Sequence, residues 1–422
     1  MPNMICSRRK FVAVGYGMAR FSTRCLFAAA LVVSSMSGVL ATPGVARANF
    51  DQFLERLWPE AQRAGISRTT FNAAFRGVTP DPEVIEHAEN QAEFKTPIWD
   101  YIDLRVSDTR IQNGRNMLNQ FGREAAAIET RFGVPRSILV SIWGMETNYG
   151  SHMGEKYVIR SLATLAYQGR RTKFGRQQLI AALKILQRGD IPPNAMTGSW
   201  AGAMGFTQFI PTTYNAYAVD WTGDGRRDIW RSVPDALAST GNYLRKSGWT
   251  PGLPWGWEVA LPQGFNTKLA GLGTRKTVGD WAKMGIVLAN GSKFKSGSPV
   301  KASLILPAGA EGPAFLVTQN FRAILRYNNS QAYALAVGHL ADRIDGQPTF
   351  VAAWPRPKDS LTVRDKMELQ VLLNAKGYDT GGVDGNIGPQ TLKALEKFQQ
   401  DAGLTSDGEP TARLLKYLRQ DG

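Results

Sequence analysis

The chain has 422 residues, of which 43% are hydrophobic and 20% charged, and its formal net charge is +15. This length suits two or three domains, and the composition is that of an ordinary folded protein, which excludes a low-complexity chain and a disulfide-rich scaffold. The excess of positive charge indicates a polyanionic partner such as nucleic acid, anionic lipid or cell wall, but charge alone does not choose among them.

Residues 1–48 have the pattern of a secretory signal peptide. Basic residues come first, an apolar run follows from Leu26 to Leu40, and a small-x-small cleavage site stands at Ala46-Arg47-Ala48. The run is too short for a membrane span, so we expect export to the periplasm without stable membrane insertion; an N-terminal anchor is the alternative. The leader holds six basic residues and no acid, which leaves +9 for the rest of the chain.

The route of export stays open. The leader also contains Ser7-Arg8-Arg9-Lys10-Phe11, which is similar to a twin-arginine signal, although the apolar run does not follow it directly. Both cysteines, Cys6 and Cys25, lie in this segment. Arg24 precedes Cys25, so no lipoprotein signal is evident, and the mature protein needs no disulfide in an oxidising compartment.

Beyond the leader, the apolar spacing predicts a mainly helical protein with a small β-containing insert. Helices are expected over most of residues 49–135, and then over 135–146, 177–186 and 330–344. Short strands are expected at 257–261, 302–306 and 315–317. The sequence A-A-W-P-R-P-K at 352–358 indicates an extended linker. We therefore predict a domain over 49–348, a linker over 349–360 and a second domain over 361–419.

One carboxylate stands out in the sequence S-I-W-G-M-E-T-N-Y-G, which ends at Gly150. On a helix, Ile142, Trp143 and Glu146 share one side, so this acid extends an apolar face. A carboxyl group against an apolar surface keeps its proton longer than a free one, as a general acid for glycosidic bond cleavage must. The alternative is a surface glutamate that ends a helix.

Two further segments have the residue types of a sugar-binding cleft. S-W-A-G-A-M-G-F-T-Q-F-I-P, from Ser199 to Pro211, combines glycines and aromatic rings with the amide of Gln208. R-Y-N-N-S-Q-A-Y contains Tyr327, Asn328 and Tyr333. Taken singly, the first segment reads equally as a tight core loop and the second as partly buried core.

Together, the three segments resemble the lytic murein transglycosylases of the membrane-bound B type, glycoside hydrolase family 103. The resemblance extends from about Asn49 to Asp345 and implies a lysozyme-like α+β catalytic domain. It implies that Glu146 is the single catalytic acid/base. The residues that it places along the glycan cleft are Ser199, Gln208, Tyr327, Asn328 and Tyr333.

The resemblance also implies an unusual reaction. A hydrolase of sugars uses two carboxylates, but between Glu146 and Asp220 the only other acids are Glu155 and Asp190. On the family's pattern, the β-1,4 bond between N-acetylmuramic acid and N-acetylglucosamine in peptidoglycan is cleaved without water. The product has a 1,6-anhydromuramoyl end.

An acidic loop, D-W-T-G-D-G-R-R-D, begins at Asp220. Its spacing partly follows an EF-hand calcium loop, but Arg231 stands where the closing glutamate belongs. A weak structural calcium site and a plain Asp/Gly turn are both open, and no cofactor is required by the reaction. The candidate ligands are Asp220, Thr222, Asp224, Arg226 (through its carbonyl), Asp228 and Asp235. The three histidines are scattered, which disfavours a zinc site.

The segment from Leu361 to Leu418 alternates helical spacing with D-G turns. Its D-G-N-I-G-P-Q-T sequence, from Asp384, resembles the three-helix peptidoglycan-binding domain; the alternative is another helical interaction module. Such a domain would hold the enzyme on an insoluble polymer.

The sequence thus predicts an exported lytic transglycosylase with peptidoglycan as its partner and other cell-wall enzymes as further candidates. Two alternatives remain: a hydrolytic muramidase, and a non-catalytic peptidoglycan-binding scaffold. Nucleic acid is disfavoured as a partner by the export signal and by the lack of a basic helix.

Overall fold

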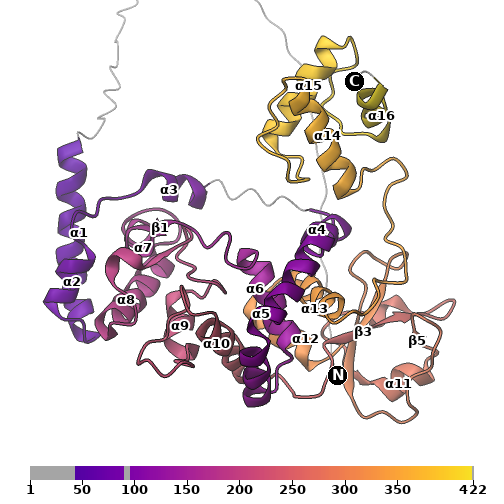
Figure 1. Ribbon diagram of the computed structural model, residues 1–422, viewed down its shortest axis with the longest axis horizontal. Coiled ribbons are helices and arrows are strands. Elements are labelled where there is room, and N and C mark those ends of the chain that lie inside the picture. Colours follow the sequence, from indigo (N-terminus) through magenta and orange to yellow (C-terminus); the bar gives the residue numbers. More distant parts are fainter. Residues whose placement is uncertain (1–42, 90–95, 421–422) are drawn as a thin grey trace, which may run out of the picture. The chain divides into compact units, whose positions relative to one another are not determined.

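The computed structural model describes residues 43–89 and 96–420 (Figure 1). Residues Arg47–Gly422 form one compact unit. The predicted leader therefore lies almost wholly outside the described residues, and its cleavage site falls inside the first helix, Pro43–Arg63. None of the helices in the described ranges is long and apolar enough to cross a membrane.

Helices make up most of the described chain, which confirms the predicted mainly α architecture. The helices before the sheet are α1 (Pro43–Arg63), α2 (Arg68–Ala74), α3 (Pro82–Glu89), α4 (Ile98–Arg105), α5 (Asp108–Phe132), α6 (Arg136–Thr147), α7 (Val158–Tyr167), α8 (Thr172–Arg188), η1 (Pro193–Ala195), α9 (Pro211–Tyr217) and α10 (Val233–Lys246). The remaining helices are η2 (Thr267–Leu269), α11 (Val278–Lys283), α12 (Gln319–Tyr327), α13 (Gln331–Ile344), α14 (Val363–Ala375), α15 (Pro389–Asp401) and α16 (Ala412–Gln420).

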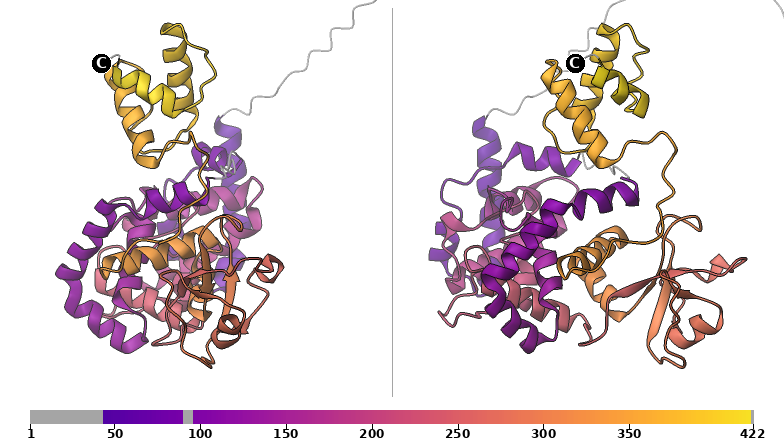
Figure 2. Two further views of the ribbon diagram at one scale, coloured as in Figure 1. Left: turned by 90° about the vertical axis from the view of Figure 1, so that its right-hand side faces the viewer. Right: turned by 45° about the vertical axis from the view of Figure 1, so that its right-hand side comes forward.

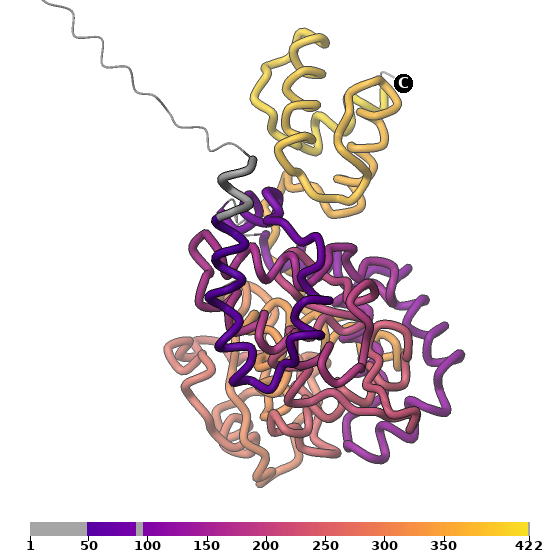
Figure 3. Tube along the Cα trace, turned by 90° about the vertical axis from the view of Figure 1, so that its left-hand side faces the viewer, coloured from indigo at the N-terminus to yellow at the C-terminus, as the bar shows by residue number. Residues whose placement is uncertain are grey.

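Two hydrophobic cores hold the helical body together. One joins α5, α6, α10, α12 and α13, and its buried members include Ile128, Ile142, Leu237 and Leu335. The other joins α1, α2, α7, α8 and α9, and α1 and α2 lie side by side at its edge (Figure 3). At this edge the ring of Phe50 meets that of Tyr167 edge-on, with 5.3 Å between the ring centroids.

The predicted β insert is present as a five-stranded antiparallel sheet in the order β4-β6-β7-β3-β5 (Figures 1 and 2). Its strands are β3 (Gly256–Ala260), β4 (Lys276–Thr277), β5 (Val287–Leu288), β6 (Lys301–Ile305) and β7 (Ala314–Val317). The three strands expected from the sequence correspond to β3, β6 and β7, each beginning one residue earlier. A separate pair joins β1 (Lys156–Tyr157) to β2 (Thr197–Gly198).

The insert is built onto the helical body by β7, which is buried along its whole length. Phe315 and Val317 belong to the core that contains α6 and α13, whereas Ala314 and Leu316, on the opposite face of the strand, belong to the insert's own core. Since successive residues of a strand point to opposite faces, β7 ties the two cores together. The insert is thus a fixed part of the helical body.

The C-terminal helices α14, α15 and α16 pack around their own core, which includes Leu369, Leu395, Phe398 and Leu415. Each D-G turn is held by a glutamine from the preceding helix. Gln370 accepts hydrogen bonds from the backbone N–H groups of Asp384 and Gly385, at 3.0 and 2.8 Å. In the second turn, Gln399 accepts from the backbone N–H of Gly408 at 2.8 Å and donates to Asp407 Oδ1 at 2.7 Å, as Gln370 donates to Asp384 Oδ1. The repeat of helix and D-G turn in the sequence therefore corresponds to the same hydrogen-bonding arrangement, formed twice.

Candidate active site

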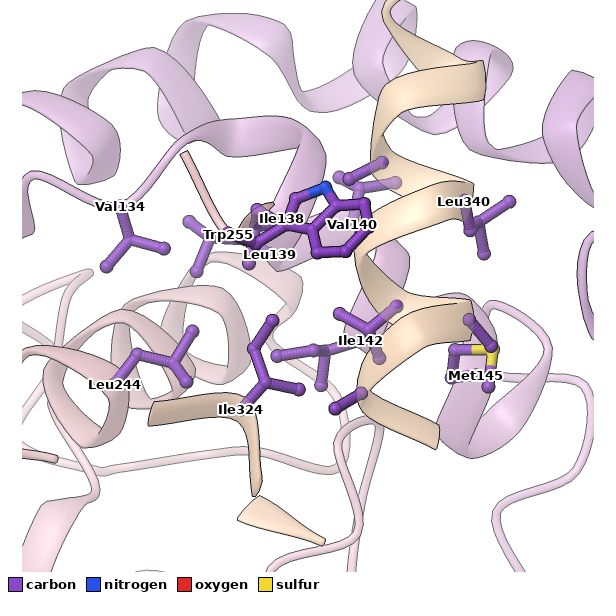
Figure 4. Close-up of a cluster of buried hydrophobic side chains, with 14 of the residues drawn as sticks. Val134, Ile138, Leu139, Val140, Ile142, Met145, Leu244, Trp255, Ile324 and Leu340 are labelled. Carbon is purple, nitrogen blue, oxygen red and sulfur yellow. The ribbon is translucent and has the colours of Figure 1, made fainter. Parts of the chain in front are cut away.

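Helix α6 carries Glu146 on its last turn. Pro135 precedes the helix, and Asn148 ends it in the left-handed conformation, at φ 48°. The helix therefore lies within one residue of its predicted bounds, 135–146. Ile138, Leu139 and Ile142 lie in one hydrophobic cluster with Ile324 of α12, Leu340 of α13 and Trp255, which precedes β3 (Figure 4). Because ten of its twelve residues are buried, the helix is fixed against the core, and the position of Glu146 is fixed with it.

Glu146 is half-buried and holds one hydrogen bond to a side chain distant in sequence. The Tyr333 hydroxyl, on α13, donates to Glu146 Oε1 at 2.6 Å. Burial raises the pKa of Glu146 to about 7, while the Tyr333 hydroxyl and the nearby charge of Arg105 act to lower it. A carboxyl group with this pKa is populated in both protonation states near neutral pH, as a group that must give and then take a proton requires.

Tyr333, which was predicted to line the glycan cleft, contacts Glu146 directly. It is only 3% exposed, and its hydroxyl is engaged with the carboxyl group of Glu146. The two positions are 187 residues apart in the chain, so no local pattern could indicate this pair. The contact ties α13 to the carboxyl group at the end of α6, and the role of Tyr333 in the cleft stays a prediction.

Sequence reasoning missed two residues of α4 that belong to the surroundings of Glu146. The charge of Arg105 reaches Glu146, and the carboxylate of Glu146 in turn acts to raise the pKa of Tyr101, whose main perturbation is burial. The Arg105 guanidinium lies 5.7 Å from the centroid of the Tyr101 ring. Their spacing of four residues on a helix was a signal, but nothing in the sequence linked that helix to α6.

The loop that contains Ser199 and Gln208 is tied to the end of α6. The Thr147 hydroxyl donates to Phe206 O at 2.7 Å. Gln208 has a φ of 52°, and its side-chain amide donates to Gly205 O and Met153 O at 3.0 and 3.1 Å. These bonds bring the first two predicted motifs together. They also engage the Gln208 side-chain nitrogen with the backbone.

Ser199 closes a turn in the same loop. Its hydroxyl accepts a hydrogen bond from the backbone N–H of Ala203 at 3.0 Å. Glycine is required at position 205, where φ is 68° and an added Cβ would lie 2.4 Å from Ile229 O. The small residues of this motif therefore permit close backbone packing, which is the alternative noted from the sequence, and they shape the loop that carries Gln208.

The third motif reaches the same region. The Tyr327 hydroxyl donates to Thr207 O at 2.6 Å, and Tyr327 and Gln208 line one pocket of about 200 Å³. Asn328 follows at the end of α12 and is exposed. The structure thus brings Gln208, Tyr327 and Tyr333 together around the end of α6.

The other acids of this region have different roles. Glu155 is exposed. Asp190 is buried and forms ion pairs with Arg227 and Arg188, at 2.6 and 3.0 Å. Burial acts to raise the pKa of Asp190, but the hydrogen bonds and charges of the two arginines outweigh it and keep that pKa below its usual value. Among the described residues, no other carboxylate perturbs the pKa of Glu146.

The acidic loop from Asp220 is held by its own backbone. Asp220 accepts hydrogen bonds from the N–H groups of Gly223 and Gly225, at 2.7 and 2.9 Å. Asp235 is buried and accepts from the N–H groups of Trp221, Thr222 and Asp228. Within residues 43–89 and 96–420, no three acidic, histidine or cysteine side chains are grouped to hold a metal ion.

Comparison with known proteins identifies the family. The family described as "Transglycosylase SLT domain" matches residues 49–342, and the "Putative peptidoglycan binding domain" family matches residues 365–418. The chain belongs to the SLT transglycosylase family. The match covers all three motifs and the β insert between them.

Relatives of known structure agree with this result. The chain is 33% identical over 312 residues to membrane-bound lytic murein transglycosylase B of Escherichia coli (strain K12), covering 70% of this chain and 82% of that protein. It is also similar to the structure of SltB3 from Pseudomonas aeruginosa in complex with NAG-anhNAM-pentapeptide. That likeness has a TM-score of 0.72 and 54% identity, and covers 88% of this chain and 99% of the other.

The SLT family fold is lysozyme-like, as predicted, with the small sheet as an addition. A third similar structure, the lytic transglycosylase Slt35 of Escherichia coli, was solved in complex with calcium; it has a TM-score of 0.60 and 28% identity, and covers 70% of this chain and 92% of the other. For the present chain, calcium binding at the Asp220 loop stays a prediction. The catalytic and glycan-binding roles of the named residues also stay predictions.

Proposed function

We propose that this protein, a lytic transglycosylase of the SLT family that acts on peptidoglycan, uses Glu146 as its only acid and base. The observation that carries the proposal is the environment of this carboxyl group. It is half-buried, its pKa is raised to about 7, and its hydrogen-bond partner is the neutral Tyr333 hydroxyl. Its surroundings therefore suit proton transfer in both directions at neutral pH.

In the proposed reaction, Glu146 first protonates the oxygen that joins N-acetylmuramic acid to N-acetylglucosamine. The bond from that oxygen to C1 breaks, and the 2-acetamido group of the substrate stabilises the positive charge at C1. Glu146, now a carboxylate, takes the proton of the C6 hydroxyl, and the C6 oxygen bonds to C1. The carboxyl group is restored, the product has a 1,6-anhydromuramoyl end, and no water is consumed.

A hydrolytic muramidase is less well supported. An inverting or retaining hydrolase of the usual kind needs a second carboxylate about 5 to 9.5 Å from the first. Of the acids between Glu146 and Asp220, Asp190 is paired with arginines and Glu155 is exposed. A non-catalytic scaffold does not explain why an acid with a raised pKa is positioned at the end of a buried helix.

The test is product analysis. The mature protein, Glu146→Gln and the exposed control Glu155→Gln are incubated with purified peptidoglycan, and the released muropeptides are weighed by mass spectrometry. We expect products one water lighter than reducing-end forms from the wild type and from Glu155→Gln, and none from Glu146→Gln. Reducing-end products would establish a hydrolase, and no products from any of the three would support a binding-only protein.

Around this site we propose roles for the neighbouring residues. Gln208, Ser199, Tyr327 and Asn328 line the glycan cleft, supported by the meeting of their loops at the end of α6. We further propose that residues 1–48 direct export to the periplasm and that residues 361–419, after the linker 349–360, bind the wall. Mass spectrometry of the mature N-terminus from a cell-envelope fraction tests the first of these two proposals.

A further inference from the structure

The β insert carries an uneven share of the protein's positive charge. From residue 268 to residue 301 the chain has seven basic residues and a single acid, Asp280, which gives +6. Residues 49–422 together have a charge of +9. Residues 268–301 thus hold most of the excess positive charge, and the rest of the mature chain is close to neutral.

The basic residues of the insert lack the ion pairs found elsewhere. In the helical body, buried acids such as Asp81 and Asp190 each pair with two basic side chains. In the insert, Lys283 is 3.6 Å from Asp280 and both are largely exposed. The other six have no ion pair within the described part of the chain. We call these six the basic surface: Lys268, Arg275, Lys276, Lys293, Lys295 and Lys301.

The sheet brings parts of this surface together. Lys276 lies on the edge strand β4, and Lys301 lies opposite Thr277 on the neighbouring strand β6. Lys293 and Lys295 lie in the loop that follows β5, the strand at the opposite edge, where the N–H of Leu288 donates to Ser292 O at 2.9 Å. That loop then runs to the β4 edge, where the N–H of Gly279 donates to Ser298 O at 3.1 Å and the N–H of Val278 donates to Val300 O at 2.7 Å. Basic residues therefore stand at both edges of the sheet.

Two properties of this surface restrict its partner. Five of the six side chains are exposed, and Lys276 is half-buried. Met284 is the single large hydrophobic side chain of the described insert that is exposed, at 36%. A surface with charge and almost no apolar area binds through electrostatics and lacks the hydrophobic anchors with which proteins insert into a lipid surface. The partner it fits is a polymer with repeated carboxylates.

We propose that the basic surface binds the stem-peptide carboxylates of peptidoglycan strands beside the strand that occupies the cleft. The choice of polymer rests on the proposed function, and the similar SltB3 structure holds a ligand with a pentapeptide. Because β7 joins the insert to the core around α6, a strand held on the insert keeps the Glu146 cleft close to the wall. The insert is then a second wall-binding element besides the C-terminal domain.

The test measures binding without cleavage, in the full mature chain with Glu146→Gln in every sample. One variant reverses three charges of the basic surface: Lys293→Glu, Lys295→Glu and Lys301→Glu. A matched control reverses three exposed basic residues of the helical body that also have no ion pair within the described ranges: Arg56→Glu, Arg123→Glu and Lys184→Glu. Both variants change the net charge equally, and their Tm values establish that they are folded.

Binding is measured by co-sedimentation with insoluble peptidoglycan, with the same wall after its carboxylates have been blocked as methylamides, and with vesicles that contain phosphatidylglycerol. We expect the insert variant to bind untreated wall roughly tenfold more weakly than the control variant at about 0.05 M salt. The difference should shrink strongly at about 0.5 M salt, where charges are screened within a few ångströms. On the blocked wall the two variants should bind equally.

An equal loss of binding to the wall in the insert variant and in the control variant would overturn the proposal, because it would show an effect of net charge alone. A loss on vesicles without a loss on wall would also overturn it and would assign the surface to anionic lipid. The reaction is tested separately by the muropeptides that the wild type releases, so a failure of the proposed chemistry is distinguishable from a failure of this binding.

Discussion

The Tyr333–Glu146 contact allows a prediction about the pH dependence of the enzyme. Burial raises the pKa of Glu146 to about 7, and the hydrogen bond from Tyr333 opposes that rise because a donor stabilises the ionised carboxylate. Tyr333→Phe removes the hydroxyl and keeps the buried ring. The pKa of Glu146 should therefore rise further in this variant.

The size of the shift follows from the strength of the bond. At 2.6 Å the bond is short, and a hydrogen bond to a charged group contributes about 1.5 to 3 kcal/mol. The neutral acid also accepts this bond, so about half of that energy discriminates between the two protonation states. Since about 1.4 kcal/mol corresponds to one pH unit, the pKa of Glu146 should rise to about 8 in the variant.

The assay is kcat/KM for a soluble glycan fragment between about pH 5 and pH 9, which reports the pKa values of the free enzyme. Glu146 must start protonated, so activity should fall as the pH rises through its pKa. In Tyr333→Phe this alkaline limb should move up by about one pH unit, whatever happens to the maximum rate.

Tyr327→Phe is the matched control, because its hydroxyl donates to Thr207 O and not to Glu146. It should change the rate without moving the alkaline limb. A limb that stays in place in Tyr333→Phe, or moves to lower pH, would refute the assignment of Glu146 as the titrating acid or of Tyr333 as its donor.

Three further predictions concern stability. The pKa of Glu146 is about 7 in the folded protein and 4.5 ordinarily, so the stability that its proton provides is complete below pH 4.5 and lost as the pH rises through 7. Glu146→Gln should therefore be more stable than the wild type by up to about 3 kcal/mol at pH 8. Denaturant titrations that give the same difference in unfolding free energy between the two proteins at pH 5 and at pH 8 would contradict this. Gly205→Ala should destabilise the fold by about 1–3 kcal/mol more than Gly223→Ala. Both glycines have positive φ, but an added Cβ at Gly205 would lie 2.4 Å from Ile229 O, whereas one at Gly223 meets nothing within 4 Å. Equal Tm values for the two variants would exclude the close approach to Ile229 as a cause of instability. Calcium binding at the Asp220 loop predicts that about 1 mM calcium raises Tm by a few degrees over its value in a chelator and that Asp220→Asn abolishes the rise. A Tm that is the same with calcium and with chelator would exclude the site.

Much of this protein could be read from local sequence. The 3.6-residue spacing placed Glu146 on the apolar side of a helix, and that helix ends at Thr147, one residue after its predicted end. The strands of the insert and the helices of the C-terminal unit were likewise predictable, because each depends on neighbouring residues and on turn chemistry. The motifs were specific enough to identify the family.

What the local sequence could not determine depends on residues far apart in the chain. The hydroxyl donor of Glu146 comes from a helix 187 residues later, and the nearby charge of Arg105 comes from an earlier helix. Only the packing of α4, α6 and α13 places these groups around one carboxyl group and removes it from water. The raised pKa is therefore a property of the tertiary structure, since desolvation and hydrogen bonding depend on which side chains meet in space.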